Sequence, residues 1–171
     1  MQTTYIGNTG PTPLGDLWVA VSENGLVAVD FPTTQTDFIA RLEKHRGGPV
    51  EFAPEKVREA VEQLREYAAG NRREFSMPID WSVLNDFQHR ALKFTAAIPY
   101  GQTRTYKYIA VELGNPRAAR AVGRAEATNP MPIVLPCHRV VGSDGKLHGY
   151  GGGAGLPTKE WLLRLEKALI A

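Results

Sequence analysis

The residues with the clearest chemical potential are consecutive: Cys137 is followed by His138 and Arg139. A cysteine reacts as its thiolate, and a neighbouring imidazole or guanidinium can favour that form. Three closely spaced prolines precede the cysteine and exclude a helix there, so we expect Cys137 at the end of a buried, rigid, extended segment. A lone cysteine is more often an inert buried residue, and it is this context that favours a nucleophile.

The histidine could serve as the base for that nucleophile. Adjacent side chains of an extended chain point to opposite faces, which makes direct contact between Cys137 and His138 awkward and favours a bridging water. The imidazole would then need an orienting acceptor. Glu166 is a candidate because it shares a helix side with Leu162; the alternative is a solvated glutamate paired with Arg or Lys.

A glycine-rich loop follows the cysteine. Gly149 and Gly151–Gly153 surround Tyr150, so the backbone could press against a flat ligand. The loop lacks the GK[ST] ending of a phosphate-binding loop.

The elements around these residues are predicted to be mainly helical. We expect helices over 86–97, capped by Asp86, over 106–113, over 117–127 and over 157–169, the last with Trp161, Leu162, Leu165 and Leu169 on its apolar face. The second and third surround a Gly114-Asn115-Pro116 turn, as in a helix-turn-helix. The third is rich in arginine and small residues, which suits a phosphate backbone; the alternative is a helical hairpin packed in a core.

The first half of the chain is predicted to be a structural scaffold, and it contains no group of residues that suggests a catalytic site. The pattern predicts a β-hairpin over 14–31 that turns at Glu23-Asn24-Gly25, helices over 37–45 and 54–69, and a strand through Phe75, Met77 and Ile79.

Length and composition limit the classes of protein. The 171 residues suffice for one domain or two small ones, and the single cysteine excludes an internal disulfide and a multi-cysteine zinc site. There is no apolar run long enough to span a membrane and no secretory signal, so we expect a cytoplasmic protein. The net charge of +2 combines an acidic first half with a basic second half, which favours a polyanionic partner for the second half.

The second half resembles the O6-alkylguanine-DNA alkyltransferases. The motifs that carry the resemblance are Ile98-Pro99-Tyr100-Gly101, Tyr106, Arg120-Ala121-Val122-Gly123, Asn129-Pro130, Pro136-Cys137-His138-Arg139-Val140 and Gly149-Tyr150. The resemblance is dense over 86–166 and weaker before it. It implies an α+β protein: a ribonuclease H-like sheet with helices over 1–85, and over 86–171 a helical domain with a helix-turn-helix variant and an active-site loop.

The resemblance also implies an activity. The protein would bind double-stranded DNA through the minor groove, flip out an alkylated guanine, and transfer the alkyl group irreversibly to its own Cys137, as a monomer without cofactor or metal. It leaves open whether O4-alkylthymine is also repaired. In the implied mechanism His138 acts as a base through a water, Glu166 orients His138, and Asn129 is the hinge beside the cysteine. Tyr106 would help rotate the nucleotide and donate a proton to the guanine, and Arg120 would enter the duplex in place of the flipped base. The residues implied to contact DNA are Gln88, Lys107, Asn115 and Ser143, and those implied to form the pocket wall are Tyr150, Gly151 and Pro132.

One departure from the family pattern stands out. Glu126 occupies a position where many relatives have asparagine, and we expect its charge at the end of the helix over 117–127 to weaken phosphate contact. Two alternatives to repair remain: a protein that binds the lesion without catalysis, whose known examples replace the cysteine, and a multiple-turnover cysteine hydrolase, against which the basic second half argues.

Overall fold

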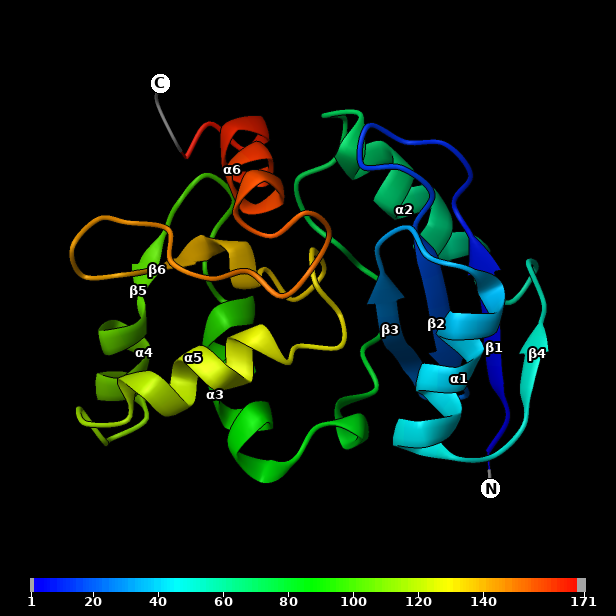
Figure 1. Ribbon diagram of the computed structural model, residues 1–171, viewed down its shortest axis with the longest axis horizontal. Helices are drawn as coiled ribbons and strands as arrows, with labels where there is room; N and C mark the ends of the chain where they lie inside the picture. The colour runs from blue at the N-terminus through cyan, green and yellow to red at the C-terminus, as the bar shows by residue number, and fades with distance from the viewer. Residues whose placement is uncertain (1, 169–171) are drawn as a thin grey trace. The chain divides into compact units, whose positions relative to one another are not determined.

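The computed structural model describes residues 2–168 and divides into two compact units between Val83 and Leu84. Both units are visible in Figure 1. The α+β class expected from the sequence is confirmed, with the sheet in the first unit and most helices in the second. In the described part of the chain, no helix combines the length and apolar character that a membrane crossing requires.

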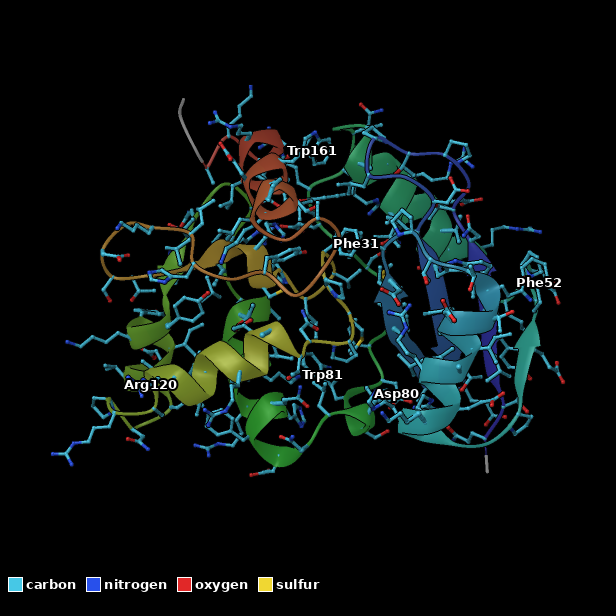
Figure 2. All side chains as sticks on the ribbon, viewed as in Figure 1. Phe31, Phe52, Asp80, Trp81, Arg120 and Trp161 are labelled. Atoms are coloured by element: carbon cyan, nitrogen blue, oxygen red, sulfur yellow. The ribbon has the colours of Figure 1, made fainter. Side chains whose placement is uncertain are left out.

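A four-stranded sheet forms the first unit. Its strands are β1 (Thr4–Asn8), β2 (Trp18–Ser22), β3 (Gly25–Asp30) and β4 (Val50–Phe52), in the spatial order β3-β2-β1-β4. β1 pairs antiparallel with β2 and parallel with β4. The predicted hairpin is confirmed as β2 and β3, and β4 at the sheet edge exposes Phe52 (Figure 2).

Two helices cover the sheet. They are α1 (Gln35–Arg46), which Thr34 caps through Asp37 N and Gly47 ends, and α2 (Arg58–Ala68). Ile6 of β1 packs in one cluster with Phe38 of α1, whereas a Cβ on the next residue, Gly7, would strike Val57 at the start of α2. Because successive strand residues point to opposite faces, α1 and α2 cover opposite faces of the sheet.

The predicted strand through Phe75, Met77 and Ile79 is wrong. Among the described residues this segment makes only an isolated bridge, between Ile79 and Leu26, before a short 3-10 helix, η1 (Trp81–Val83). The segment pairs with the outer edge of β3 only at Leu26, through Leu26 N to Pro78 O and Asp80 N to Leu26 O at 2.9 Å each, and the chain then turns into η1.

Three helices and one apolar cluster form the centre of the second unit: α3 (Asp86–Ala96), α4 (Tyr106–Glu112) and α5 (Ala119–Ala127). Asn85, rather than the expected Asp86, caps α3 by accepting a hydrogen bond from Gln88 N. The cluster that joins the helices contains mostly small and β-branched residues: Ala91, Ile98, Ile109, Ala110, Ala118, Val122, Ala125 and Val140. Small core residues let α4 and α5 lie close together.

The remaining elements bring the sequence motifs together. β5 (Arg104–Thr105) pairs in parallel with β6 (Val140–Val141), so Tyr106, which directly follows β5, lies beside the segment that follows Cys137. Cys137–Arg139 is a 3-10 helix, η2, and α6 (Leu156–Leu165) packs on it. α6 is shorter than predicted: Glu166 is its C-cap, and Leu169 lies outside the described residues.

Candidate active site

Cys137 is held by turns rather than at the end of an extended segment, which corrects the sequence expectation. The backbone N of Leu135 donates to Met131 O at 2.9 Å, and that of Cys137 donates to Leu135 O at 2.7 Å. Ile133 adopts a left-handed φ of 76°. The prolines do prevent a regular helix before the cysteine, but they impose a sequence of tight turns that is equally rigid.

Asn129 braces these turns from both sides. Its Nδ2 donates to Leu135 O at 2.8 Å, and its Oδ1 accepts from Met131 N at 2.9 Å. The side chain is buried, so both hydrogen bonds are shielded from water. These two hydrogen bonds support the hinge role that the resemblance implied for Asn129, and that role stays a prediction.

His138, Arg139 and Glu166 form a buried charged cluster. Nε2 of His138 lies 2.8 Å from Glu166 Oε2, and the guanidinium of Arg139 donates to both carboxylate oxygens at 2.8 and 2.9 Å. Arg139 also donates to Ile98 O at 2.6 Å. Glu166 is therefore buried and doubly paired, and the alternative of a solvated glutamate is wrong.

This cluster fixes the state of the imidazole. Burial, as the main cause, lowers the pKa of His138 below 6.5, so the ring is neutral near pH 7. The Glu166 carboxylate can only accept, so Nε2 carries the hydrogen and Nδ1 carries the lone pair. The pKa of Glu166 falls to about 2 because the hydrogen bonds from His138 and Arg139 outweigh its burial.

The resting state of Cys137 differs from expectation. Burial, and secondly the carboxylate of Glu126, raise the pKa of the thiol to about 12. Arg139 does not favour the thiolate directly, because its guanidinium is engaged by Glu166 and Ile98. Cys137 is thus a protonated thiol in the free protein, and a nearby base must remove this proton to form the thiolate during the reaction.

Lys159 ties the active-site loop to Tyr106. The lysine is fully buried on α6, and its Nζ donates to Val140 O and Leu147 O at 2.7 Å each, and to Gly149 O and Tyr106 Oη at 3.3 Å. Burial lowers the pKa of Lys159 to about 8 and raises that of Tyr106 to about 12. Tyr106 is therefore a neutral phenol with an oriented hydroxyl group.

Glu126 is not at the surface, contrary to the expectation that it would oppose phosphate contact. It is buried on α5, and Thr95 Oγ1 of α3 hydrogen-bonds to its Oε1. Burial raises its pKa to about 8. The sequence indicated a charged helix end because arginines surround it; the helix turns this residue inward with Val122 and Ala125.

A cavity of about 760 Å³ opens beside the sulfur. This volume lies in the range typical of small-molecule sites and has room for a purine. Tyr106, Glu126 and Cys137 line it together with Tyr150 and Gly151, while Pro132 is buried and is not among the lining residues. The further lining residues are Lys107, Ala119, Arg120, Gly123, Ala127, Gly142, Ser143, Asp144, His148 and Gly149.

The five residues expected to contact DNA lie on the second unit and are mostly exposed. Lys107, Asn115, Arg120 and Ser143 are exposed, and Figure 2 shows Arg120 on α5. Gln88 is partly exposed and donates to Thr128 at the end of α5 through its side-chain Nε2, at 2.9 Å to Oγ1. Asn115 Oδ1 accepts from Arg117 N at 3.2 Å, which uses part of its capacity in the turn itself.

The burial of two charged residues beside the site was not predicted from the sequence. Lys159 was not singled out and Glu126 was expected at the surface, because charged residues are usually solvated. The spacing on α6 held a signal: Lys159 and Glu166 lie on either side of Leu162 at i, i+3 and i+7, so both share its buried face.

A metal centre has no basis in the described chain. Among residues 2–168, no three His, Cys, Asp or Glu side chains are grouped so that they could hold an ion.

Comparisons with known proteins agree over the whole chain. Residues 2–81 match the model described as "6-O-methylguanine DNA methyltransferase, ribonuclease-like domain", and residues 86–168 match its "DNA binding domain". A methylated-DNA–protein-cysteine methyltransferase of Methanosarcina barkeri is 43% identical over 158 residues, which is 91% of this chain and 93% of the relative.

Solved structures give the same result. The crystal structure of Mycobacterium tuberculosis O6-methylguanine methyltransferase is similar at a TM-score of 0.77 and 36% identity, covering 100% of this chain and 96% of the other. The Mycobacterium tuberculosis OGT in complex with DNA is similar at a TM-score of 0.75 and 36% identity, covering 97% and 93%. With a cysteine beside a buried histidine–glutamate pair and a cavity that has room for a purine, the chain belongs to the 6-O-methylguanine DNA methyltransferase family.

Proposed function

We propose that this protein repairs alkylated DNA by transferring the alkyl group from O6 of guanine to Cys137. The activity is that of a methylated-DNA–protein-cysteine methyltransferase, in which a cysteine of the protein itself accepts the alkyl group from DNA. Cys137 is the only cysteine of the chain. The observation that carries the proposal is the position of this cysteine, on the wall of a cavity with room for a purine and next to the His138–Glu166 pair.

The chemistry follows from the protonation states. The neutral His138 takes the thiol proton through a water, and Glu166 stabilises the imidazolium that forms. The sulfur lone pair then attacks the alkyl carbon, and the carbon–O6 bond breaks with its electron pair leaving on the purine. Tyr106, a phenol oriented by Lys159, donates the proton that the anionic purine needs. The thioether is stable, so each molecule acts once.

The second unit supplies the contact with DNA. A base in a duplex cannot reach a buried sulfur, so the nucleotide must leave the stack. The exposed Arg120 on α5 is suited to fill the space that the base vacates, and Lys107, Ser143, Asn115 and Gln88 to contact the backbone. The small residues of α5 suit close approach in the minor groove, and one protein monomer suffices for this arrangement.

A lesion-binding protein without catalysis is the second candidate function. It would need the cavity and the basic surface but no nucleophile. Known proteins of that kind replace the cysteine, whereas this chain keeps Cys137 on the wall of the cavity.

Label transfer separates the two functions. Duplex DNA with a radiolabelled O6-methylguanine is incubated with the wild-type protein and with Cys137→Ala. We expect label on the wild type only, and comparable affinity of both proteins for the duplex. If the wild-type protein binds the lesion but acquires no label, the second candidate function is favoured. If Cys137→Ala acquires label, Cys137 is not the acceptor.

A further inference from the structure

Glu126 is a buried acid without a cationic partner at ion-pair distance among residues 2–168. Its Oε1 meets Thr95 Oγ1, while Oε2 is buried and has no hydrogen-bond partner in the described part of the chain. An ionised carboxylate with a bare, buried oxygen is costly, so this geometry favours the protonated acid.

The hydrogen-bond inventory at Thr95 agrees with a protonated acid. The threonine hydroxyl has one hydrogen but two neighbours that could take it, Glu126 Oε1 and Ala91 O, the latter at 3.3 Å. If Glu126 carries a proton on Oε1, it donates to Thr95, and Thr95 donates to Ala91. Burial also raises the pKa of Glu126 to about 8, in the same direction.

Three titratable groups face Glu126 from the elements packed around it. Cys137 on η2 and Tyr106 on α4 line the same cavity, and Lys159 lies on α6; Thr95 on α3 does not titrate. A negative charge on Glu126 raises the pKa values of both Cys137 and Tyr106, and at Cys137 the charge of Lys159 offsets it in part. The other charged residues along the cavity are Lys107, Arg120, Asp144 and His148.

The proposed reaction passes through anions in this cavity. The thiolate is negative before attack, and the purine is negative as it leaves. A carboxylate nearby opposes both charges, in a site where burial leaves them poorly screened. A neutral carboxylic acid opposes neither and can donate a hydrogen bond.

We propose that Glu126 is a positioning residue that sets the pH range of the nucleophile: Cys137 reacts while Glu126 is neutral and is restrained when Glu126 loses its proton. This inference rests on the proposed function for its meaning in repair. The coupling between the two side chains exists whatever the substrate is.

The test compares the wild type with Glu126→Gln, which cannot ionise. Cys137 is the only cysteine, so its alkylation by iodoacetamide followed by mass spectrometry reports one thiol. We expect similar rates near pH 6 and a Glu126→Gln rate about tenfold or more above wild type near pH 9.5, since a nearby charge shifts a pKa by about one unit or more. A rate ratio that is constant with pH would overturn the inference.

A second arm uses the proposed reaction without DNA. In single-turnover transfer from free O6-benzylguanine, the wild-type rate should rise less steeply with pH once Glu126 ionises. This change of slope produces a bend in the plot of rate against pH, and Glu126→Gln should lack the bend. If the iodoacetamide ratio changes with pH but no variant dealkylates DNA or the free base, the proposed function fails and the coupling stands. If transfer proceeds and the ratio is flat, only this inference fails.

Two further variants guard against indirect effects. Once Glu126 ionises, the Thr95 hydroxyl can donate to the carboxylate, and this charged hydrogen bond is stronger than the one that the neutral acid makes. Thr95→Val removes it, so the bend should move to higher pH; an unmoved bend would contradict the inference even if Glu126→Gln fails to fold. Glu62→Gln changes an exposed glutamate of α2 in the other unit and should follow the wild-type profile.

Discussion

His138 and Arg139 share one carboxylate, and this sharing links the reactivity of the site to the stability of its fold. Glu166 accepts from both side chains while fully buried. A carboxylate in this position orients the base and balances the charge of a guanidinium that is largely buried. The motif therefore contributes to structure and to chemistry through the same oxygens.

Glu166→Gln should be strongly destabilising. Glutamine leaves the buried Arg139 cation uncompensated, which costs about 3 kcal/mol or more in the free energy of unfolding. Glu160→Gln on the same helix is the matched control, because its pair with Arg164 is exposed and contributes less than about 1 kcal/mol. Urea denaturation of both variants measures the difference, and equal losses would show that the cluster is not a stabilising one.

The same cluster predicts the response to acid. Glu166 has its pKa lowered from 4.5 to about 2, so its stabilising contribution is complete above pH 4.5 and is lost as the pH falls toward 2. His138 is buried neutral with a lowered pKa, so its contribution is complete above pH 6.5 and is also lost on acidification. We expect the thermal midpoint to fall with pH from about 6.5 downward. A midpoint that is level down to pH 4 would contradict this picture.

At the scale of elements, the glycine loop is placed by its contact with α5. A Cβ on Gly151 would lie 2.3 Å from Ala127 O, so only glycine lets the loop reach the helix backbone. On the neighbouring Gly149 a Cβ would meet nothing within 4 Å. These two glycines of one loop thus face different steric demands.

Gly151→Ala should displace the loop and with it Tyr150, which lines the cavity. We expect the rate with free O6-benzylguanine to fall by about tenfold or more, because misplacement by about 1 Å can cost about 100-fold. Gly149→Ala should cost clearly less, since its Cβ enters open space. Similar losses in both variants would mean that the loop is not placed by contact with α5.

The elements that could be predicted from the sequence are those that local residues determine, and those that depend on contacts between separate segments could not. The hairpin of β2 and β3 and the helices α3–α6 follow from local turns, caps and periodicity, and the predicted spans differ by a few residues. β1 was missed because its place depends on pairing with β2 and β4, which are distant in sequence. Cys137, His138 and Arg139 were found because they are consecutive, whereas the roles of Asn129 and Tyr106 came from the family resemblance. The inward positions of Lys159 and Glu126 depend on burial, which tertiary packing decides.

At the scale of the molecule, the charge asymmetry follows the division into two units. The acidic part is the sheet unit, and the basic part contains α4, α5 and the cavity. The boundary predicted after residue 85 remains a prediction about domains, and the compact units meet at residues 83 and 84. DNA binding is therefore expected to depend on cations of the second unit.

The dependence of DNA affinity on salt tests this expectation. The logarithm of the affinity should fall linearly with the logarithm of salt concentration, and Lys107→Ala should reduce the slope by about one unit. Lys44→Ala removes an exposed lysine of α1 in the first unit and should leave the slope unchanged. A slope that Lys44→Ala reduces and Lys107→Ala does not would place the DNA surface elsewhere.

A carbon group that moves from the base to the sulfur of Cys137 should stay there. Intact-protein mass spectrometry with peptide mapping, after exposure to excess O6-methylguanine duplex, measures this directly. We expect a gain of a single methyl group per protein, located on Cys137, with no further repair once all protein is methylated. Repair in excess of the protein present, or a methyl group on another residue, would contradict it.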